Sequence, residues 1–145
     1  MEKYTNKLDV LTTQRAIEFL RKRFQEELSS ALMLTRVSAP LFVLKGSGIN
    51  DDLSGTERPV AFDIKETGDV VEVVHSLAKW KRMALAKYGF ASHRGLYTDM
   101  NAIRRDEKCD SIHSIYVDQW DWEKIIDESD RNEEYLKDTV RKIYS

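Results

Sequence analysis

Cysteine is almost absent from this sequence, and its scarcity excludes two kinds of structure. Cys109 is the single cysteine, so the chain contains neither an intrachain disulfide nor a cysteine-based zinc site. The histidines are scattered and lack a metal-ligand spacing such as HxxxH: His75, His93 and His113. A reducing, cytoplasmic compartment is the simplest interpretation of this composition.

Long hydrophobic runs are also missing. No apolar run approaches the ~18 residues that a membrane-spanning helix needs. The first residues, Met1–Tyr4, show no hydrophobic core of a signal peptide. The sequence therefore predicts no membrane partner.

An excess of charge of one sign is missing as well. The net charge is −2, so no bulk field attracts nucleic acid or an acidic membrane, and we expect no nucleic-acid partner. Basic residues are concentrated locally, at 21–23, 79–82 and 104–105, where they suit an anionic ligand as well as a solvated face. The 145 residues, of which 41% are apolar and 33% charged, predict one globular domain.

The first half of the chain alternates between helical and extended patterns. A long helix is predicted from near Thr13, the expected N-cap, with one apolar face: Ile17, Leu20, Phe24, Leu28 and Leu32. Residues 34–40 are predicted to be extended. Residues 45–58 are predicted to form a loop whose three glycines permit backbone angles that other residues resist. The glycine spacing is that of neither a P-loop nor GxGxxG, so it predicts no nucleotide site.

The second half is predicted to be richer in strands. Alternating patterns predict four strands, at 60–64, 70–74, 96–104 and 112–123. Between the second and third, Ser76 is expected to cap a helix over 77–88 with a shared face: Leu77, Trp80, Ala84 and Tyr88.

A final helix is predicted from Asp130, with Glu133 as its capping-box partner. Its expected buried stripe is Leu136, Val140, Ile143 and Tyr144. The sequence then stops at Ser145 without a C-cap glycine. An amphipathic turn is an unusual place for a chain to end, so we expect this sequence to be part of a longer one.

The strand at 112–123 carries the most informative pattern. Because side chains alternate across a strand, it presents a polar row, Gln119, Asp121 and Glu123, opposite a row of aromatic residues, Tyr116, Trp120 and Trp122. This arrangement is typical of the floor of a polar site. A half-exposed strand with a solvated acidic face explains it as well, and the pattern alone favours that alternative.

Two further segments suit anions. Arg104 ends the neighbouring strand, where a guanidinium can hold a phosphate in a bidentate manner. The turn at 73–82 leads into a helix whose N-terminal N–H groups form an anion site, and Lys81 lies where it can point toward the sheet. A mixed-charge surface loop and an ordinary solvated stripe are the alternatives.

Three strings taken together resemble the ammonia-dependent asparagine synthetases, the aspartate–ammonia ligases. They are VVHSLAKWKR at 73–82, GLYTDM at 95–100 and YVDQWDWE at 116–123, and residues 52–55 match as well. The matches occur in order across nearly the whole chain. The resemblance implies an α+β fold: part of the antiparallel sheet of class II aminoacyl-tRNA synthetases, flanked by helices that we expect on one side.

The resemblance also implies a reaction. Aspartate would attack the α-phosphate of Mg-ATP through its side-chain carboxylate, giving β-aspartyl-AMP and pyrophosphate. Ammonia would then displace AMP to give asparagine. ATP and Mg²⁺ are the implied cofactors, aspartate and ammonia the implied substrates, and a homodimer the implied assembly.

Roles for individual residues follow from the same resemblance. It gives catalytic roles to Arg104, which would hold the α-phosphate, and Asp51, which would bind the substrate amino group or ammonia. It places ATP against Arg104, Glu107, His113 and Ser114. It places aspartate against Ser76, Lys81, Gln119 and Asp121, and assigns metal or ATP placement to Glu123. The first helix would build the dimer interface through Phe19, Phe24 and Leu28.

The sequence departs from the family in one respect. The Gly-rich segment with a following arginine that completes the class II nucleotide site has no counterpart here. We therefore expect residues 1–145 to be the N-terminal part of a single catalytic domain, truncated and inactive alone. The alternative is a non-catalytic amino-acid-binding or dimerisation module.

Overall fold

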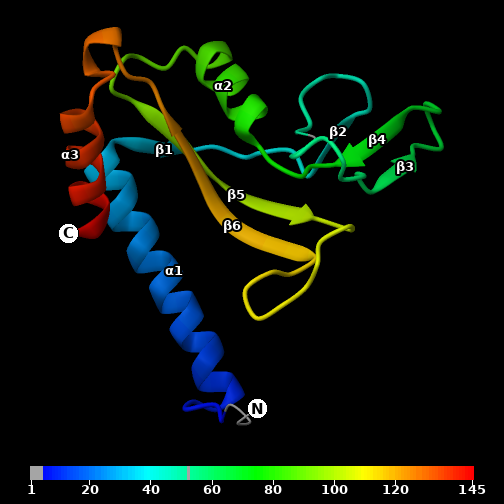
Figure 1. Ribbon diagram of the computed structural model, residues 1–145, viewed down its shortest axis with the longest axis horizontal. Coiled ribbons are helices and arrows are strands. Elements are labelled where there is room, and N and C mark those ends of the chain that lie inside the picture. The colour runs from blue at the N-terminus through cyan, green and yellow to red at the C-terminus, as the bar shows by residue number, and fades with distance from the viewer. Residues whose placement is uncertain (1–4, 52) are drawn as a thin grey trace.

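The chain forms an α+β fold, as the sequence predicts (Figure 1). The structure is a computed structural model that describes residues 5–51 and 53–145; the Met1–Tyr4 segment and Asp52 of the family motif lie outside it. Its elements in order are α1 (Val10–Leu32), β1 (Leu34–Arg36), β2 (Phe42–Leu44), β3 (Ala61–Asp63), β4 (Val70–Val73), α2 (Ala78–Lys87), β5 (Gly95–Ile103), β6 (Tyr116–Lys124), the 3-10 helix η1 (Glu128–Asp130) and α3 (Glu133–Tyr144).

The larger sheet has the strand order β1-β5-β6. The β5–β6 pair is antiparallel, as expected, and runs in register from Gly95 opposite Lys124 to Ile103 opposite Tyr116. The edge strand β1 is instead parallel to β5, which the long crossover between them allows. Gly95 lies where the three strands meet, and a Cβ there would come within 2.5 Å of the Glu123 carbonyl oxygen. The sheet therefore needs glycine at this position.

A smaller sheet of order β2-β4-β3 lies beside the larger one (Figure 1). The predicted strands at 60–64 and 70–74 are confirmed as β3 and β4, which pair antiparallel. Strand β2 was not predicted, because three residues are too few to show a period. In the loop that follows β2, Gly46 and Gly48 adopt positive φ angles of +78° and +75°, as predicted from the glycines.

Helix α1 begins earlier than the pattern predicts. Asp9, not Thr13, is the N-cap, because its carboxylate accepts a hydrogen bond from the Thr12 N–H at 3.0 Å. Only the C-terminal part of the predicted apolar face of α1 is buried against the larger sheet. There Leu28 and Leu32 form a cluster with Leu34, Tyr97 and Trp122, whereas Leu20 is 63% exposed. Leu28 is therefore part of the chain's own core, which contradicts its predicted place at a dimer interface.

Helix α2 covers the opposite side of the same sheet. Leu77, Trp80 and Ala84 are buried there, in a cluster that reaches Leu96 and Met100 of β5. The expectation of helices on one side only is thus wrong: α1 and α2 flank the sheet from opposite faces. Tyr88, predicted on the buried face of α2, is 52% exposed because the helix ends at Lys87.

The C-terminal helix departs most from its prediction. Asp130 closes the 3-10 turn η1, and α3 is capped by Asn132, whose side chain accepts from the Tyr135 N–H at 2.9 Å. The predicted buried stripe is largely exposed, at 62% for Leu136 and 92% for Tyr144. Helix α3 lies beside α1 and contributes no buried residue (Figure 1). No helix in the described part of the chain is both long and apolar enough to cross a membrane.

Candidate functional site

The predicted polar row lies on the side of the larger sheet that α2 covers. Cross-strand pairs place Gln119 opposite Met100, Asp121 opposite Thr98 and Glu123 opposite Leu96. Directly opposed residues share a face, so the row faces α2 together with the buried residues of β5. Trp120 and Trp122 face α1 instead, as predicted from the alternation.

Lys81 reaches this row from α2. Its Nζ donates to Asp121 Oδ1 at 2.5 Å and to the carbonyl oxygen of Trp122 at 2.9 Å, and it lies 3.4 Å from Glu123 Oε2. Only 6% of the Lys81 side chain is exposed. Taking an ammonium out of water is unfavourable unless its donors are engaged, and here they are. The prediction that Lys81 points toward the sheet is confirmed, and the alternative of a solvated stripe does not hold for it.

Glu123 is held by two cations. Besides Lys81, the Arg82 Nε lies 3.7 Å from its other oxygen. A carboxylate that already balances two cations offers little to a divalent metal ion, since the three cations repel one another. The surroundings of Glu123 therefore do not fit its expected metal role while both cations are in place.

Gln119 lies between the Lys81 cluster and the end of β5. Among the described residues, its Nε2 donates only to the Met100 sulfur, at 3.5 Å. A thioether is a weak acceptor, so this donor is nearly free to bind a ligand. Gln119 thus remains a candidate for the predicted contact with an amino acid.

Arg104 continues the same face beyond β5. Its N–H donates to the Ile115 carbonyl oxygen at 2.7 Å, which extends the strand pairing and keeps Arg104 in alternation with Met100 and Ala102. The Arg104 Nε is buried and has no hydrogen-bond partner within the described residues. A guanidinium donor without an acceptor fits a phosphate oxygen. From Asp121 to Arg104 the row spans ~20 Å of strand, comparable with an amino acid joined to a nucleotide.

The loop between β5 and β6 does not gather its predicted ATP ligands into one cluster. His113 is exposed, and its Nδ1 lies 2.9 Å from Asp110. Hydrogen bonds from the N–H of Ile112 and from the His113 side chain hold the pKa of Asp110 below its ordinary value. Glu107 donates its N–H to the Arg104 carbonyl oxygen, and Ser114 is exposed. The structure therefore places Glu107 beside Arg104 in a turn and leaves His113 and Ser114 outside it.

An unpredicted ion pair ties this loop to the glycine-containing loop. Arg58 donates three times to Asp106: through its backbone N–H at 2.8 Å, its Nε at 3.0 Å and a terminal nitrogen at 2.6 Å. The guanidinium of Arg58 holds the pKa of Asp106 well below its usual range. This pair restrains the loop that begins at Arg104.

Asp51 and Ser76 lie on two neighbouring segments, the glycine-containing loop and the turn before α2. The His75 Nδ1 lies 3.2 Å from the Asp51 carbonyl oxygen, which joins the two segments. Ser76 precedes the N-cap position, which Leu77 occupies, so the expected cap is wrong by one residue. Its Oγ nevertheless accepts from the Ala78 N–H at 3.1 Å.

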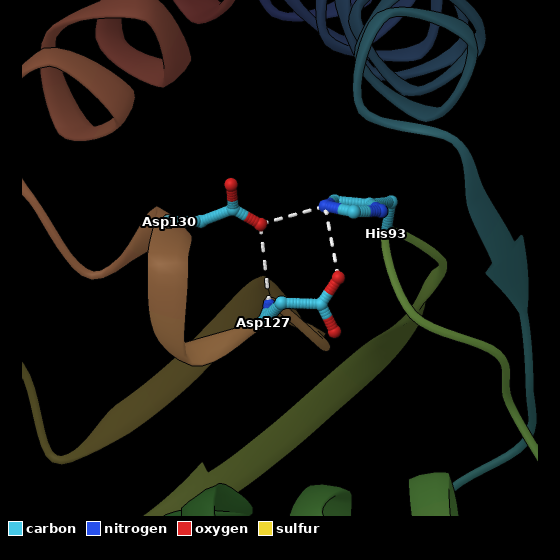
Figure 2. A group of neighbouring side chains, drawn as sticks. All are labelled: His93, Asp127 and Asp130. Carbon is cyan, nitrogen blue, oxygen red and sulfur yellow. Dashed lines mark hydrogen bonds and ion pairs between the residues drawn. The ribbon is translucent and has the colours of Figure 1, made fainter.

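A second polar cluster lies at the opposite end of β5 (Figure 2). His93 Nε2 is 2.6 Å from Asp130 Oδ2 and 3.7 Å from Asp127 Oδ2. These three residues are the one His/Asp group within the described residues whose ligand atoms converge closely enough to hold a metal ion. The hydrogen bond from His93 holds the pKa of Asp130 below its ordinary value. Because ~30 Å of strand separates His93 from Arg104, the cluster is not part of the candidate site.

Sequence reasoning did not assign roles to several residues that shape the site. Asn50, Arg58, His75 and Arg82 contact the predicted ligands or their loops. Only their position in the sequence could have pointed to two of them, because Asn50 directly precedes Asp51 and His75 directly precedes Ser76. Their partners lie 22 to 48 residues away in sequence, where no local pattern reports them.

Comparison with known proteins identifies relatives of this chain. Residues 11–145 match the family described as aspartate-ammonia ligase. The aspartate–ammonia ligase of Fusobacterium nucleatum is 65% identical over 142 residues, which are 98% of this chain and 43% of that protein. The ligase of Ruminiclostridium cellulolyticum is 63% identical over 145 residues, and that of Ligilactobacillus salivarius 58% over 142. The chain thus spans about 43% of the length of these relatives.

Solved structures support the fold. Two structures of pyrrolysyl-tRNA synthetase from Desulfitobacterium hafniense superimpose with TM-scores of 0.53 and 0.56. They cover 90% and 97% of this chain, and the chain covers 49% and 59% of theirs. At 16% and 14% identity, these matches concern the fold alone. The α+β fold with a partial class II synthetase-like sheet is confirmed.

Proposed function

The chain belongs to the aspartate–ammonia ligase family, and from that premise we propose that it supplies the aspartate-activating face of such a ligase. The proposed reaction joins aspartate to AMP and then exchanges AMP for ammonia, giving asparagine, AMP and pyrophosphate. ATP is a substrate of the first step. The whole ligase, of which this chain matches about 43%, is the proposed acting unit.

The observation that carries the proposal is the buried Lys81 cluster. A buried ammonium between Asp121 and Glu123 is unfavourable to assemble, and the same face also carries Arg104 with its unpartnered Nε. Unsatisfied or tightly balanced charges at one face are typical of functional sites. Lys81 lies near one end of the polar row and Arg104 at the other. These two cations suit a ligand that carries a carboxylate at one end and a phosphate at the other, as aspartate beside ATP does.

The first step in this proposal uses these residues for binding and orientation. The ammonium of Lys81 keeps its hydrogen bonds to Asp121 and the Trp122 carbonyl oxygen, and exchanges its 3.4 Å contact with Glu123 for the side-chain carboxylate of aspartate. Gln119 and Asp121 orient the amino acid. A carboxylate oxygen then attacks the α-phosphorus, and pyrophosphate leaves. Arg104 donates to the α-phosphate and stabilises the charge that builds up on its oxygens. The remaining parts of ATP are proposed to contact Glu107, His113 and Ser114.

The second step forms the amide. The lone pair of ammonia attacks the carbonyl carbon of the acyl-adenylate, AMP leaves with the bonding electrons, and the nitrogen loses a proton. Asp51 is proposed to bind the amino group of aspartate or the incoming ammonia, and Ser76 to line the amino-acid end. Mg²⁺ is expected to accompany the phosphates of ATP. Glu123 is balanced by Lys81 and Arg82 and holds no metal ion in the proposed reaction.

The assembly is proposed to be a homodimer, with residues 1–145 forming part of one catalytic domain in the cytoplasm. Phe19, which is 68% exposed on α1, is the proposed contact. Phe24 stacks on Trp120 of its own chain and is a weaker candidate, and Leu28 is excluded by its burial. Sedimentation of the whole ligase with Phe19→Asp tests this assembly, since a dimer should dissociate to the monomer mass.

A chimeric ligase tests the function. Residues 1–145 would replace the matching segment of the Fusobacterium nucleatum relative, which is 65% identical. We expect the chimera to exchange labelled pyrophosphate into ATP only when aspartate is present, and to form asparagine when ammonia is added. Exchange without asparagine formation would contradict the second step. Aspartate binding with no exchange would replace the proposal by a non-catalytic amino-acid-binding module.

A further inference from the structure

The Asn50 side chain links the glycine-containing loop to the segment that runs from β4 to the turn before α2. Its Oδ1 accepts from the N–H of His75 and from the N–H of Asp51, both at 3.0 Å. Its Nδ2 donates to Glu72 Oε2 and to the Val73 carbonyl oxygen, both at 3.4 Å. Both ends of the amide are therefore used, and they join the loop to the end of β4.

A second contact fixes the other side of Asp51. The His75 Nδ1 lies 3.2 Å from the Asp51 carbonyl oxygen, which can only accept, so Nδ1 must carry the proton. His75 is 1% exposed, and its Nε2 is buried without a partner in the described residues. The contact to Asp51 is therefore made by the Nδ1–H group of the ring.

Together these contacts hold the backbone of Asp51 at both of its polar groups. Asn50 takes its N–H, and His75 takes its carbonyl oxygen. The Lys79 Nζ also donates to the Asn50 carbonyl oxygen, at 3.2 Å, from the first turn of α2. With its backbone fixed, the direction of the Asp51 Cα–Cβ bond is fixed as well, which limits the positions that its carboxylate can reach.

We propose that Asn50 and His75 form a clasp that positions Asp51 against the turn carrying Ser76. This Asn50–His75 clasp rests on the proposed function, in which the Asp51 carboxylate binds an N–H donor of one of the substrates. Asn50 and His75 are positioning residues: they act through Asp51 and contact no substrate. The N–H donor is either the ammonium group of aspartate or ammonia, and the two sources are separable by kinetics.

The chimeric ligase with Asn50→Ala tests the clasp. Loss of the amide frees the backbone N–H groups of Asp51 and His75, so we expect amide hydrogen exchange in residues 45–51 to rise at least about tenfold. Asn101→Ala is the matched control, because the Asn101 amide accepts one exposed hydrogen bond, from the Tyr116 hydroxyl at 2.6 Å. That variant should leave exchange in 45–51 unchanged.

Kinetics separate positioning from a general loss of structure. If Asp51 binds aspartate, Asn50→Ala should raise the KM for aspartate in pyrophosphate exchange by about tenfold, with the KM for ATP within about twofold. If it binds ammonia, the KM for ammonia in asparagine formation should rise instead. An equal rise for ATP, or no change in any KM, would overturn the proposal.

A rescue experiment adds a readout that misfolding would not give. Asn50→Asp keeps the oxygen that accepts the two backbone N–H groups but brings a carboxylate against Glu72. Combining it with Glu72→Gln reverses the contact, because the new glutamine amide donates to the new carboxylate at position 50. We expect the double variant to recover most of the lost affinity for aspartate or ammonia. If the chimera lacks all ligase activity, the proposed function fails. Unchanged hydrogen exchange in Asn50→Ala still overturns the clasp in that case.

Discussion

The two faces of the larger sheet come from the same strands but differ in how completely their polar groups are paired. On the α1 face, Arg21 forks onto Asp118 at 2.7 and 3.2 Å, and Gln25 donates to the Tyr97 hydroxyl at 2.7 Å. Phe24 stacks on Trp120 with ring centroids 5.4 Å apart. Each polar group named here has a partner supplied by the helix that covers it.

The α2 face is paired less evenly. Lys81 is fully engaged, whereas the Gln119 amide meets only a sulfur and the Arg104 Nε meets no acceptor in the described residues. Buried polar groups normally find partners, so the donors left over on this face are available to a ligand. The α1 face is thus engaged in packing, and the α2 face is the one that we propose for ligand binding.

The largest effect should follow the removal of the central cation from the α2 face. Lys81→Met leaves Asp121 and Glu123 facing each other without their ammonium. We expect pyrophosphate exchange in the chimeric ligase to fall about 10³-fold and the free energy of unfolding to fall by about 2 kcal/mol, less than for a fully buried pair because Asp121 is partly exposed. Lys87→Met, on the exposed side of the same helix, is the control. Exchange that survives Lys81→Met would remove the basis for assigning a site to this face.

Arg104 should matter for chemistry more than for stability. Arg104→Ala removes a guanidinium whose Nε has no partner among the described residues. We therefore expect pyrophosphate exchange to fall about 10²-fold, with an unfolding midpoint that stays level or rises. Arg104→Lys should not restore exchange, because an ammonium cannot reproduce a bidentate fork. A large loss of stability in Arg104→Ala would place the residue among the packing groups instead.

The α1 face should behave in the opposite way. Trp120→Ala removes the stack with Phe24, and we expect a loss of about 2 kcal/mol in unfolding free energy. The KM values for aspartate and ATP should stay within about twofold of the parent, and Trp120→Phe should retain most of the stability. A kinetic defect as large as that of Arg104→Ala would show that the two faces are not separate.

The smallest effect concerns the loop beyond Arg104 and its pH dependence. The pKa of Asp106 is depressed by Arg58, so the pair stabilises the fold above the ordinary carboxyl pKa of about 3.9 and loses that contribution as pH falls below it. We expect the stability difference between the parent and Arg58→Gln to be constant near neutral pH and to shrink under acid. Urea unfolding at a series of pH values measures it. A difference that does not change between neutral and acid pH would argue against the ion pair.

Local periodicity was enough to predict most of the elements. The alternation in 112–123 correctly separates Gln119 and Asp121 from Trp120, because a strand fixes side-chain direction with a period of two. Helix ends were less predictable. Asp9 displaced Thr13 as a cap and Asn132 displaced Asp130, since several residues in each segment are able to cap and tertiary packing selects among them.

The sequence by itself therefore determined the family, the α+β class and the division of β6 into a polar and an aromatic row. Only the tertiary structure decided that α1 and α2 cover opposite faces, that Lys81 is buried between two carboxylates, and that Asn50 meets His75. These contacts join residues 25 to 42 positions apart. Their partners are selected by how helices and strands pack, and periodicity within one element carries no information about packing against another.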